Sequence, residues 1–377
     1  MPLFAVYALL FADHGLSSSQ IGVLLAVWSA SSFLLEVPSG AWADLLDRRR
    51  LLIASGVLYA AGFATWLTWP SFLGFLSGFV LWSLSAALMS GTYEAYLFDE
   101  LTAAGRPERY GPVKARAESV TALVMAGAIA LAAPLHALGG YALVGWTSVG
   151  VALVHTLLAV ALPRVSPAVD VDEAPDPEPA SLRAWARAVG TGAGEAASSV
   201  PVRRVLLAYG TVVALVGLDE FFPLILAEGG ASVGLIAWIL GGITLLQAAA
   251  TWCAAGVARL AGLPHAVIVA AAGLLLAAGA WWSGPPSYAA IAVGYALATA
   301  SYVSGDIRLQ HTMSGRARAT TTSVAGLVAE VGFLVALGLI SLATLRFDVA
   351  PVAAVLALVV TVPATIAAHR TPAAPVH

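Results

Sequence analysis

The chain has very few charged residues. Only 10% of its 377 residues are charged, against about 25% in soluble domains, while 60% are hydrophobic. A chain this apolar has too little polar surface to cover a soluble fold, which excludes an ordinary soluble protein. The formal net charge of −3 says little about partners, and we expect no nucleic-acid partner.

Cysteine, lysine and nucleotide-binding motifs are also scarce. The single cysteine, Cys253, excludes an intrachain disulfide. The sequence has no zinc-type cluster, P-loop or nucleotide fingerprint, which argues against a chain that hydrolyses ATP itself. We expect no metal, no cofactor and no enzymatic activity. Arginine outnumbers lysine seventeen to one, and alanine is abundant, as in proteins from GC-rich bacterial genes.

Long apolar segments dominate what is present. One membrane-spanning helix needs about 20 apolar residues, and such runs recur along the chain. The strands of membrane β-barrels alternate apolar and polar residues over about 10 positions, so they do not explain apolar runs of this length. We therefore predict an all-α integral membrane protein with twelve transmembrane helices, near residues 2–12, 20–42, 51–69, 72–97, 113–135, 141–162, 204–227, 233–257, 263–282, 287–305, 319–343 and 349–368.

The first of these segments is short. Residues 2–12 rise only about 16 Å as a helix, roughly half a bilayer. No basic stretch or small-residue cleavage site marks a signal peptide. We expect the beginning of helix one to be truncated, with a naturally short helix as the alternative.

Basic residues fall on one side of the predicted topology. Seventeen of the eighteen lie in one set of alternate loops and ends, and Arg346 alone lies in the other. The positive-inside rule places the first set in the cytoplasm. We therefore expect a multi-pass protein of a bacterial cytoplasmic membrane, with its C-terminus and central loop cytoplasmic.

The longest polar stretch, residues 163–203, divides the chain into two blocks of six segments. Acidic residues and prolines alternate in its first part, which is typical of a disordered linker. The motif Lys114-Ala115-Arg116-Ala117 recurs as Arg316-Ala317-Arg318-Ala319 in the second block. We predict a six-helix half over 1–162, a cytoplasmic linker over 163–203 and a second six-helix half over 204–377.

The loop after the second segment carries the most specific motif. Gly40 and Asp44 lie one helical turn apart and are followed by Arg48 and Arg49. This pattern resembles the signature loop of the major facilitator superfamily, although Leu45 replaces its usual basic residue and Asp47 its usual glycine. Glu36–Gly40, Gly91–Asp99, Asp219–Pro223 and Arg316–Thr320 are similar to a bacterial, drug-efflux-like branch of that superfamily.

The resemblance implies a fold and a latch. The fold is two pseudo-symmetric six-helix bundles. In the latch, Asp44 docks on the start of helix eleven near Ala319, and Asp99 is the acidic partner of Arg48. Gly40 would allow close helix approach.

Acids inside membrane segments are the candidate proton carriers. A charge at a helix centre costs about 2.5–3.5 kcal/mol, so such residues are usually protonated, paired or in contact with a wet cavity. The candidate coupling or cavity residues are Glu36, Glu94, Asp219, Glu220, Arg308 and Glu330. Glu94 and Arg308 occupy nearly equivalent positions in the two blocks, which allows them to pair between the halves, and a structural ion pair or gating contact is the favoured role for Glu94. Asp219 and Glu220 lie about 100° apart on one helix.

Aromatic and amide residues are the candidate substrate contacts, because they suit an amphipathic or cationic ligand. The candidate lining residues are Trp28, Trp82, Tyr93, Phe222, Gln247, Tyr295 and Tyr302. Trp66 and Trp69, at the outer end of helix three, are expected to lie at the lipid interface.

The sequence favours a monomeric secondary transporter that exports small amphipathic compounds in exchange for protons. Its partners would be a small-molecule substrate and the lipid bilayer, and the proton gradient would supply the energy. A proton-coupled importer of a small metabolite is the alternative; a membrane scaffold or sensor without transport is the alternative from another class.

Overall fold

The structure is a computed structural model that describes residues 1–163, 199–312 and 318–374. Within these ranges, the side chains of residues 36–45, 310, 312 and 318–324 are not described. The described backbone is helical almost throughout and contains no strand, which confirms the predicted all-α membrane fold. Apart from its two ends, the predicted linker at 163–203 lies outside the described residues.

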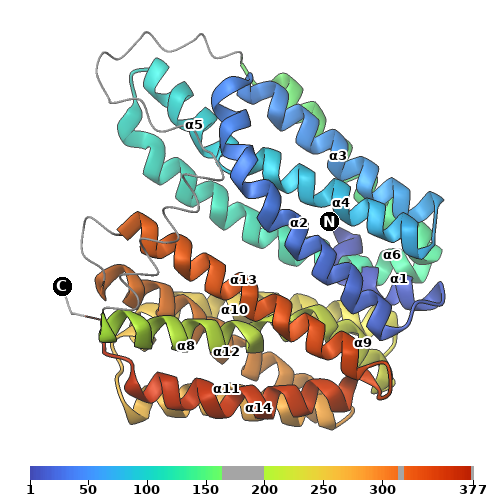
Figure 1. Ribbon diagram of the computed structural model, residues 1–377. Helices are drawn as coiled ribbons and strands as arrows, with labels where there is room; N and C mark the ends of the chain where they lie inside the picture. The colour runs from blue at the N-terminus through green and yellow to red at the C-terminus, as the bar shows by residue number, and fades with distance from the viewer. Residues whose placement is uncertain (164–198, 313–317, 375–377) are drawn as a thin grey trace. The chain divides into compact units, whose positions relative to one another are not determined.

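The helices of the N-terminal part follow the predicted segments closely (Figure 1). The fourth segment differs, because it is divided at Ser90 and Gly91, where Gly91 has a φ of 72° that favours glycine. The elements are η1 (Pro2–Ala5), α1 (Tyr7–Asp13), α2 (Ser18–Leu45), α3 (Arg48–Thr68), α4 (Phe72–Met89), α5 (Thr92–Ala103), η2 (Pro107–Arg109) and α6 (Tyr110–Ala161).

The C-terminal part contains the remaining helices. The predicted seventh segment is not one helix, because a 3₁₀ turn interrupts it. The elements are α8 (Val200–Val216), η3 (Gly217–Phe221), α9 (Phe222–Glu228), α10 (Val233–Ala258), α11 (Leu263–Trp281), α12 (Pro285–Thr312), α13 (Arg318–Ala343) and α14 (Val349–Arg370).

The described helices are consistent with twelve spans. Nine helical runs in the described chain are long and apolar enough to cross a membrane. One of them, Pro107–Ala161, has 55 residues, whereas one span needs about 20. Its backbone leaves the helical region at Gly139 and Gly140, so this run supplies two predicted segments. The first predicted segment corresponds to η1 with α1, and the tenth to α12.

Short polar side chains fix where several helices begin. Ser71, Ser199 and Ser232 each accept a hydrogen bond from the backbone N–H three residues further on, at the starts of α4, α8 and α10. Asp47 does the same for α3, because its carboxylate accepts from the N–H of Arg50 at 2.9 Å. These caps satisfy backbone donors that the first helical turn leaves without partners.

Replacing Asp47 by alanine should therefore lower the stability of the protein. We expect a loss of about 1 kcal/mol, the usual cost of removing a helix N-cap. Thermal unfolding of the purified protein in detergent would measure it. Asp47→Asn keeps a side-chain oxygen that can accept the bond and should stay close to the wild type. An equal loss in both variants would contradict the capping role.

The chain divides into two compact units. The first contains Met1–Phe4 and Val27–Trp185, and the second contains Ala5–Ala26 and Ala186–His377. The end of helix one and the start of helix two therefore pack with the C-terminal helices. These two units do not test the predicted division of the sequence into two six-helix halves at 163–203, which stays a prediction.

Helix α3 is the centre of the first unit, where it packs against α4, α5 and α6. The expected interfacial position of Trp66 is wrong, because its side chain is only 1% exposed. The indole donates to the carbonyl of Phe75 at 2.9 Å, and Gly78 of α4 leaves the space it occupies. Trp69 is 50% exposed.

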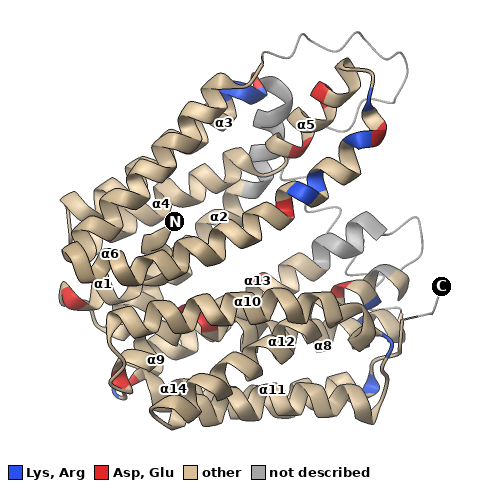
Figure 2. Ribbon diagram, turned by 180° about the vertical axis from the view of Figure 1, so that it is seen from behind, with Lys and Arg blue, Asp and Glu red and all other residues tan. Residues whose placement is uncertain are grey.

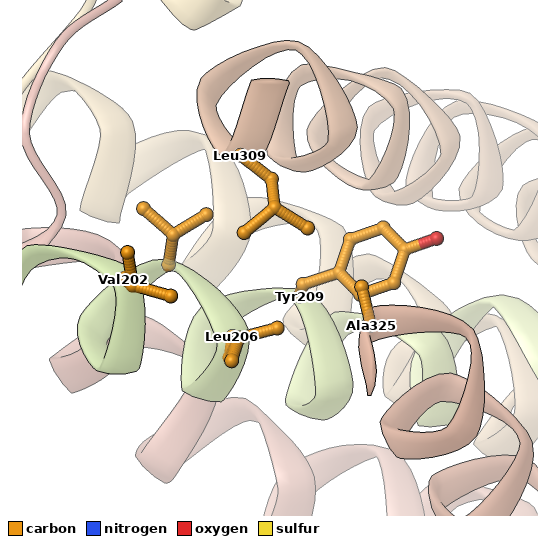
Figure 3. Close-up of a cluster of buried hydrophobic side chains, with 6 residues drawn as sticks. Val202, Leu206, Tyr209, Leu309 and Ala325 are labelled. Carbon is orange, nitrogen blue, oxygen red and sulfur yellow. The ribbon is translucent and has the colours of Figure 1, made fainter. Parts of the chain in front are cut away.

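In the second unit, α8 packs against α12, α13 and α14, while α11 lies beside α12 and α14. Figure 3 shows the core where α8 meets α12 and α13, with Leu206 and Tyr209 close to Leu309 and Ala325. Glycines allow the close approach of α8 and α13, since the carbonyl of Gly210 lies 3.0 Å from the position of a Cβ on Gly332. This packing holds the interrupted seventh segment in place.

Candidate functional site

The interruption of the seventh segment is the main polar feature inside the second unit. Helix α8 ends at Val216, the 3₁₀ turn η3 follows, and α9 begins with Phe222-Pro223. Proline has no N–H to donate, which favours a new start there. A side chain at Gly217 would lie 2.4 Å from the ring of Phe333 on α13, so the turn needs glycine at this close approach.

Two neighbouring acids lie in this turn and have different tyrosine partners. Asp219 accepts a hydrogen bond of 2.6 Å from the hydroxyl of Tyr295 on α12. Glu220 accepts one from the hydroxyl of Tyr7 on α1. Both acids are half-buried, and both tyrosines are only 4% exposed. The turn thus connects the seventh segment with the first and the tenth.

The surroundings of Tyr295 combine polar and aromatic groups. The ring of Phe222 meets that of Tyr295 edge to face, with centroids 5.3 Å apart. The amide of Gln247 on α10 lies 3.5 Å from the same hydroxyl. The structure therefore brings five candidate residues together around η3: Asp219, Glu220, Phe222, Gln247 and Tyr295. We call these five residues and Tyr7 the acid–tyrosine site.

This arrangement has a clear electrostatic consequence. Two carboxylates on adjacent residues repel each other, and apolar surroundings strengthen that repulsion. Within the described residues, neither Asp219 nor Glu220 forms an ion pair with a lysine or arginine. Binding of a proton or an organic cation would remove the repulsion. Within the same residues, no cluster of three side chains could hold a metal ion.

Tyr7 was not predicted from the sequence, because its segment differs from the others mainly in its short length. The interruption was not predicted either, although Gly217 and Pro223 flank the acids in the sequence. A glycine and a proline around a charged pair in an apolar segment are the signal that could have located the turn.

The signature loop belongs to the first unit. Its Arg48 forms an ion pair with Asp99, as the family resemblance implies. Arg49 donates to the carbonyl of Val160 near the end of α6. Asp47, which replaces the usual glycine, caps α3 with a φ of −57°, so this turn does not need glycine. The side chains of Glu36, Gly40 and Asp44 lie outside the described residues, and the docking of Asp44 on helix eleven stays a prediction.

Comparison with protein families decides the identity of the fold. The family model described as Major Facilitator Superfamily matches residues 1–337. The chain belongs to the major facilitator superfamily. No match to the chain is found among curated proteins.

Solved structures of superfamily transporters are similar over nearly the whole chain. A bacterial homologue of the human lysosomal transporter Spinster has a TM-score of 0.76 at 16% identity, covering 97% of this chain and 91% of its own. A bacterial homologue of the iron transporter ferroportin has 0.71 at 15%, covering 97% and 94%. The nucleoside transporter NupG has 0.68 at 12%, covering 95% and 91%. At these low identities, the similarities show that the chain shares the fold of these transporters and nothing finer.

Other candidate residues of this superfamily member lie outside the acid–tyrosine site. Tyr302 stacks on Tyr209 with centroids 4.7 Å apart, and their hydroxyls lie 2.7 Å apart. Glu330 is half-buried on α13. In the first unit, Tyr93 packs against the cluster of Leu52, Tyr96 and Ala159.

Trp28 and Trp82 belong to an aromatic cluster of the first unit. Their ring centroids are 5.6 Å apart, and Trp82 also stacks on Phe79 at an interplanar angle of 8°. Trp66 and Phe63 complete the side of this cluster formed by α3. The cluster packs α2, α3 and α4 together. A substrate-lining role for the two tryptophans stays a prediction.

Glu94 and Arg308 have partners within their own units. Glu94 lies 3.4 Å from the ammonium of Lys114. The guanidinium of Arg308 is buried and donates to the carbonyls of Val257, Leu260 and Pro372 at 2.6–2.8 Å. Arg308 therefore ties the end of α10 to the segment that follows α14. The predicted pair of Glu94 with Arg308 would join the two units and stays a prediction.

Proposed function

We propose that this protein is a secondary transporter that exports small amphipathic cations in exchange for protons. The observation that carries the proposal is the acid–tyrosine site, where two adjacent carboxyls lie in a helix interruption and bond to tyrosines from two other helices. Interrupted helices and intramembrane acids are the usual places of substrate and ion binding in secondary transporters.

The two acids suit different tasks. Asp219 lies on the side of Tyr295, Phe222 and Gln247, where rings and an amide would hold the apolar and polar parts of a cation. Within the described residues, the carboxyl of Glu220 accepts a hydrogen bond from the hydroxyl of Tyr7, and no ring or amide of the substrate side contacts it in the same way. We assign substrate binding to Asp219 and proton binding to Glu220.

Export rather than import is supported by the sequence motifs that resemble the drug-efflux-like branch. The structural relatives carry different cargoes by name, an iron transporter and a nucleoside transporter among them, and so do not select a substrate. The positive-inside distribution supports a cytoplasmic C-terminus in a bacterial inner membrane. Alternating access would expose the acid–tyrosine site to each side in turn.

Proton flux in everted membrane vesicles tests this function. Respiration acidifies the vesicle lumen and quenches a pH-sensitive dye; an added substrate of a proton-coupled exporter should release protons and restore fluorescence. We expect this response with amphipathic cations and not with neutral compounds of the same size.

Vesicles lacking the protein, and vesicles with Asp219→Asn and Glu220→Gln combined, serve as controls and should give no response. Proton-driven uptake into intact cells without a response in everted vesicles would instead establish an importer. Equal responses in the wild type and the double variant would contradict the role of the acid–tyrosine site.

A further inference from the structure

A groove lies at the other end of the second unit, between the start of α8 and the end of α14. It encloses about 540 Å³ and is separate from the acid–tyrosine site, which lies beyond the far end of α8. The groove is lined by Val200, Arg203, Arg204, Leu207, Thr211, Pro363, Ile366, Ala367 and Arg370.

One end of the groove is strongly basic. Arg203 and Arg204 come from the first turns of α8, and Arg370 is the last residue of α14; all three are exposed. Within the described chain, neither Arg204 nor Arg370 forms an ion pair with an acidic side chain. The guanidinium groups of Arg204 and Arg370 carry like charges beside one cavity, and a bound anion would lower their repulsion.

The groove continues as an apolar strip along both helices. Leu207 follows Arg203 by one turn on the same face of α8 and is 58% exposed. On α14, Ile366 precedes Arg370 by one turn and is 49% exposed, and Pro363 lies one further turn away. Basic heads above exposed apolar walls match the two parts of a phospholipid, a phosphate and an acyl chain.

The position along the unit agrees with this match. Figure 2 shows that the arginines of the second unit gather mainly at the end where the C-terminus lies. Helices with apolar centres and basic ends place those ends at the membrane surface. Basic pockets between transmembrane helices at that level bind anionic lipid headgroups.

We propose that this groove binds an anionic phospholipid, with its phosphate on Arg203, Arg204 and Arg370 and one acyl chain along Leu207, Pro363 and Ile366. A free phosphate would use only the basic end and leave the apolar walls exposed, so the lipid explains more of the lining. The site is independent of the proposed transport function, since the acid–tyrosine site does not contribute to it.

Native mass spectrometry of the full-length protein in detergent can test the site with added dioleoylphosphatidylglycerol. We expect the wild type to retain bound lipid, and Arg203→Gln, Arg204→Gln and Arg370→Gln combined to bind it about tenfold or more weakly. The matched control removes three exposed arginines of the first unit, Arg106→Gln, Arg109→Gln and Arg116→Gln, and should bind as the wild type does. Monodisperse elution would establish that each variant is folded.

Two further arms identify the ligand. Leu207→Asn should weaken binding of phosphatidylglycerol severalfold, and inorganic phosphate at millimolar concentration should not displace the lipid. If the combined variant elutes as an aggregate, the arginine-to-lysine triple variant replaces it and should retain partial binding. Equal lipid retention by the folded groove and control variants, or displacement by inorganic phosphate, would overturn the proposal.

Discussion

Replacing Glu220 by glutamine should abolish uphill transport while leaving substrate exchange intact. The amide cannot release a proton, so a transporter that couples through Glu220 would no longer use the proton gradient. Asp219, the acid that we assign to the substrate, keeps its bond to Tyr295 and its position beside Phe222. We expect uphill transport to fall by at least tenfold, which corresponds to only about 1.4 kcal/mol. Counterflow of labelled substrate between equal pH values should stay near the wild-type rate.

Asp219→Asn should behave differently, because it removes the carboxylate assigned to the substrate. Both uphill transport and counterflow are expected to fall. Glu108→Gln, which changes an exposed acid of η2 in the first unit, is the matched control and should preserve both activities. If Glu220→Gln and Asp219→Asn lose the same activities to the same extent, the assignment of separate tasks to the two acids is wrong.

Replacing Arg308 by methionine should cause the largest loss of stability. The side chain is 1% exposed, and its guanidinium donates to three backbone carbonyls near the ends of α10 and α14. These hydrogen bonds are part-buried, and each contributes about 1 kcal/mol to stability, so the expected total loss is about 3 kcal/mol. Thermal unfolding in detergent should show a midpoint lowered by about 5 °C or more.

Arg259→Met is the control for this prediction. Arg259 lies just after α10 and is exposed, so its replacement removes the same charge without breaking the three bonds to carbonyls. Arg308→Lys should be intermediate, because an ammonium keeps the charge but not the planar donor geometry of the guanidinium. A midpoint for Arg308→Met equal to that of Arg259→Met would show that the three carbonyl bonds do not stabilise the fold.

The positions of the helices could be predicted because the membrane imposes them. A span needs a long apolar run with internally satisfied backbone groups, and both requirements are visible in composition alone. The interruptions were harder to predict. Gly91 and Gly217 lie in apolar runs that contain many glycines, and only the structure shows that these two mark breaks. Gly91 has a positive φ, and Gly217 lies against the ring of Phe333.

Most residues of the candidate site could be predicted from the sequence, but their contacts with each other could not. Buried acids are costly, so Asp219 and Glu220 stood out without a structure. Their tyrosine partners come from helices that are distant in the sequence, and nothing local to Tyr7 or Tyr295 indicates which acid each one meets. Arg308 shows the reverse case, since a charge that seemed suited to the cavity holds helix ends together.

Hydropathy and loop motifs are local properties of the chain, and they are enough to predict a helical membrane protein, the positions of its spans and its resemblance to the superfamily. Three features became visible only in the folded protein: two adjacent acids reach tyrosines on two different helices, Trp66 is buried beside Gly78, and Arg203 and Arg204 share a groove with Arg370. These contacts depend on how distant helices pack, which follows from the shape of all the side chains between them.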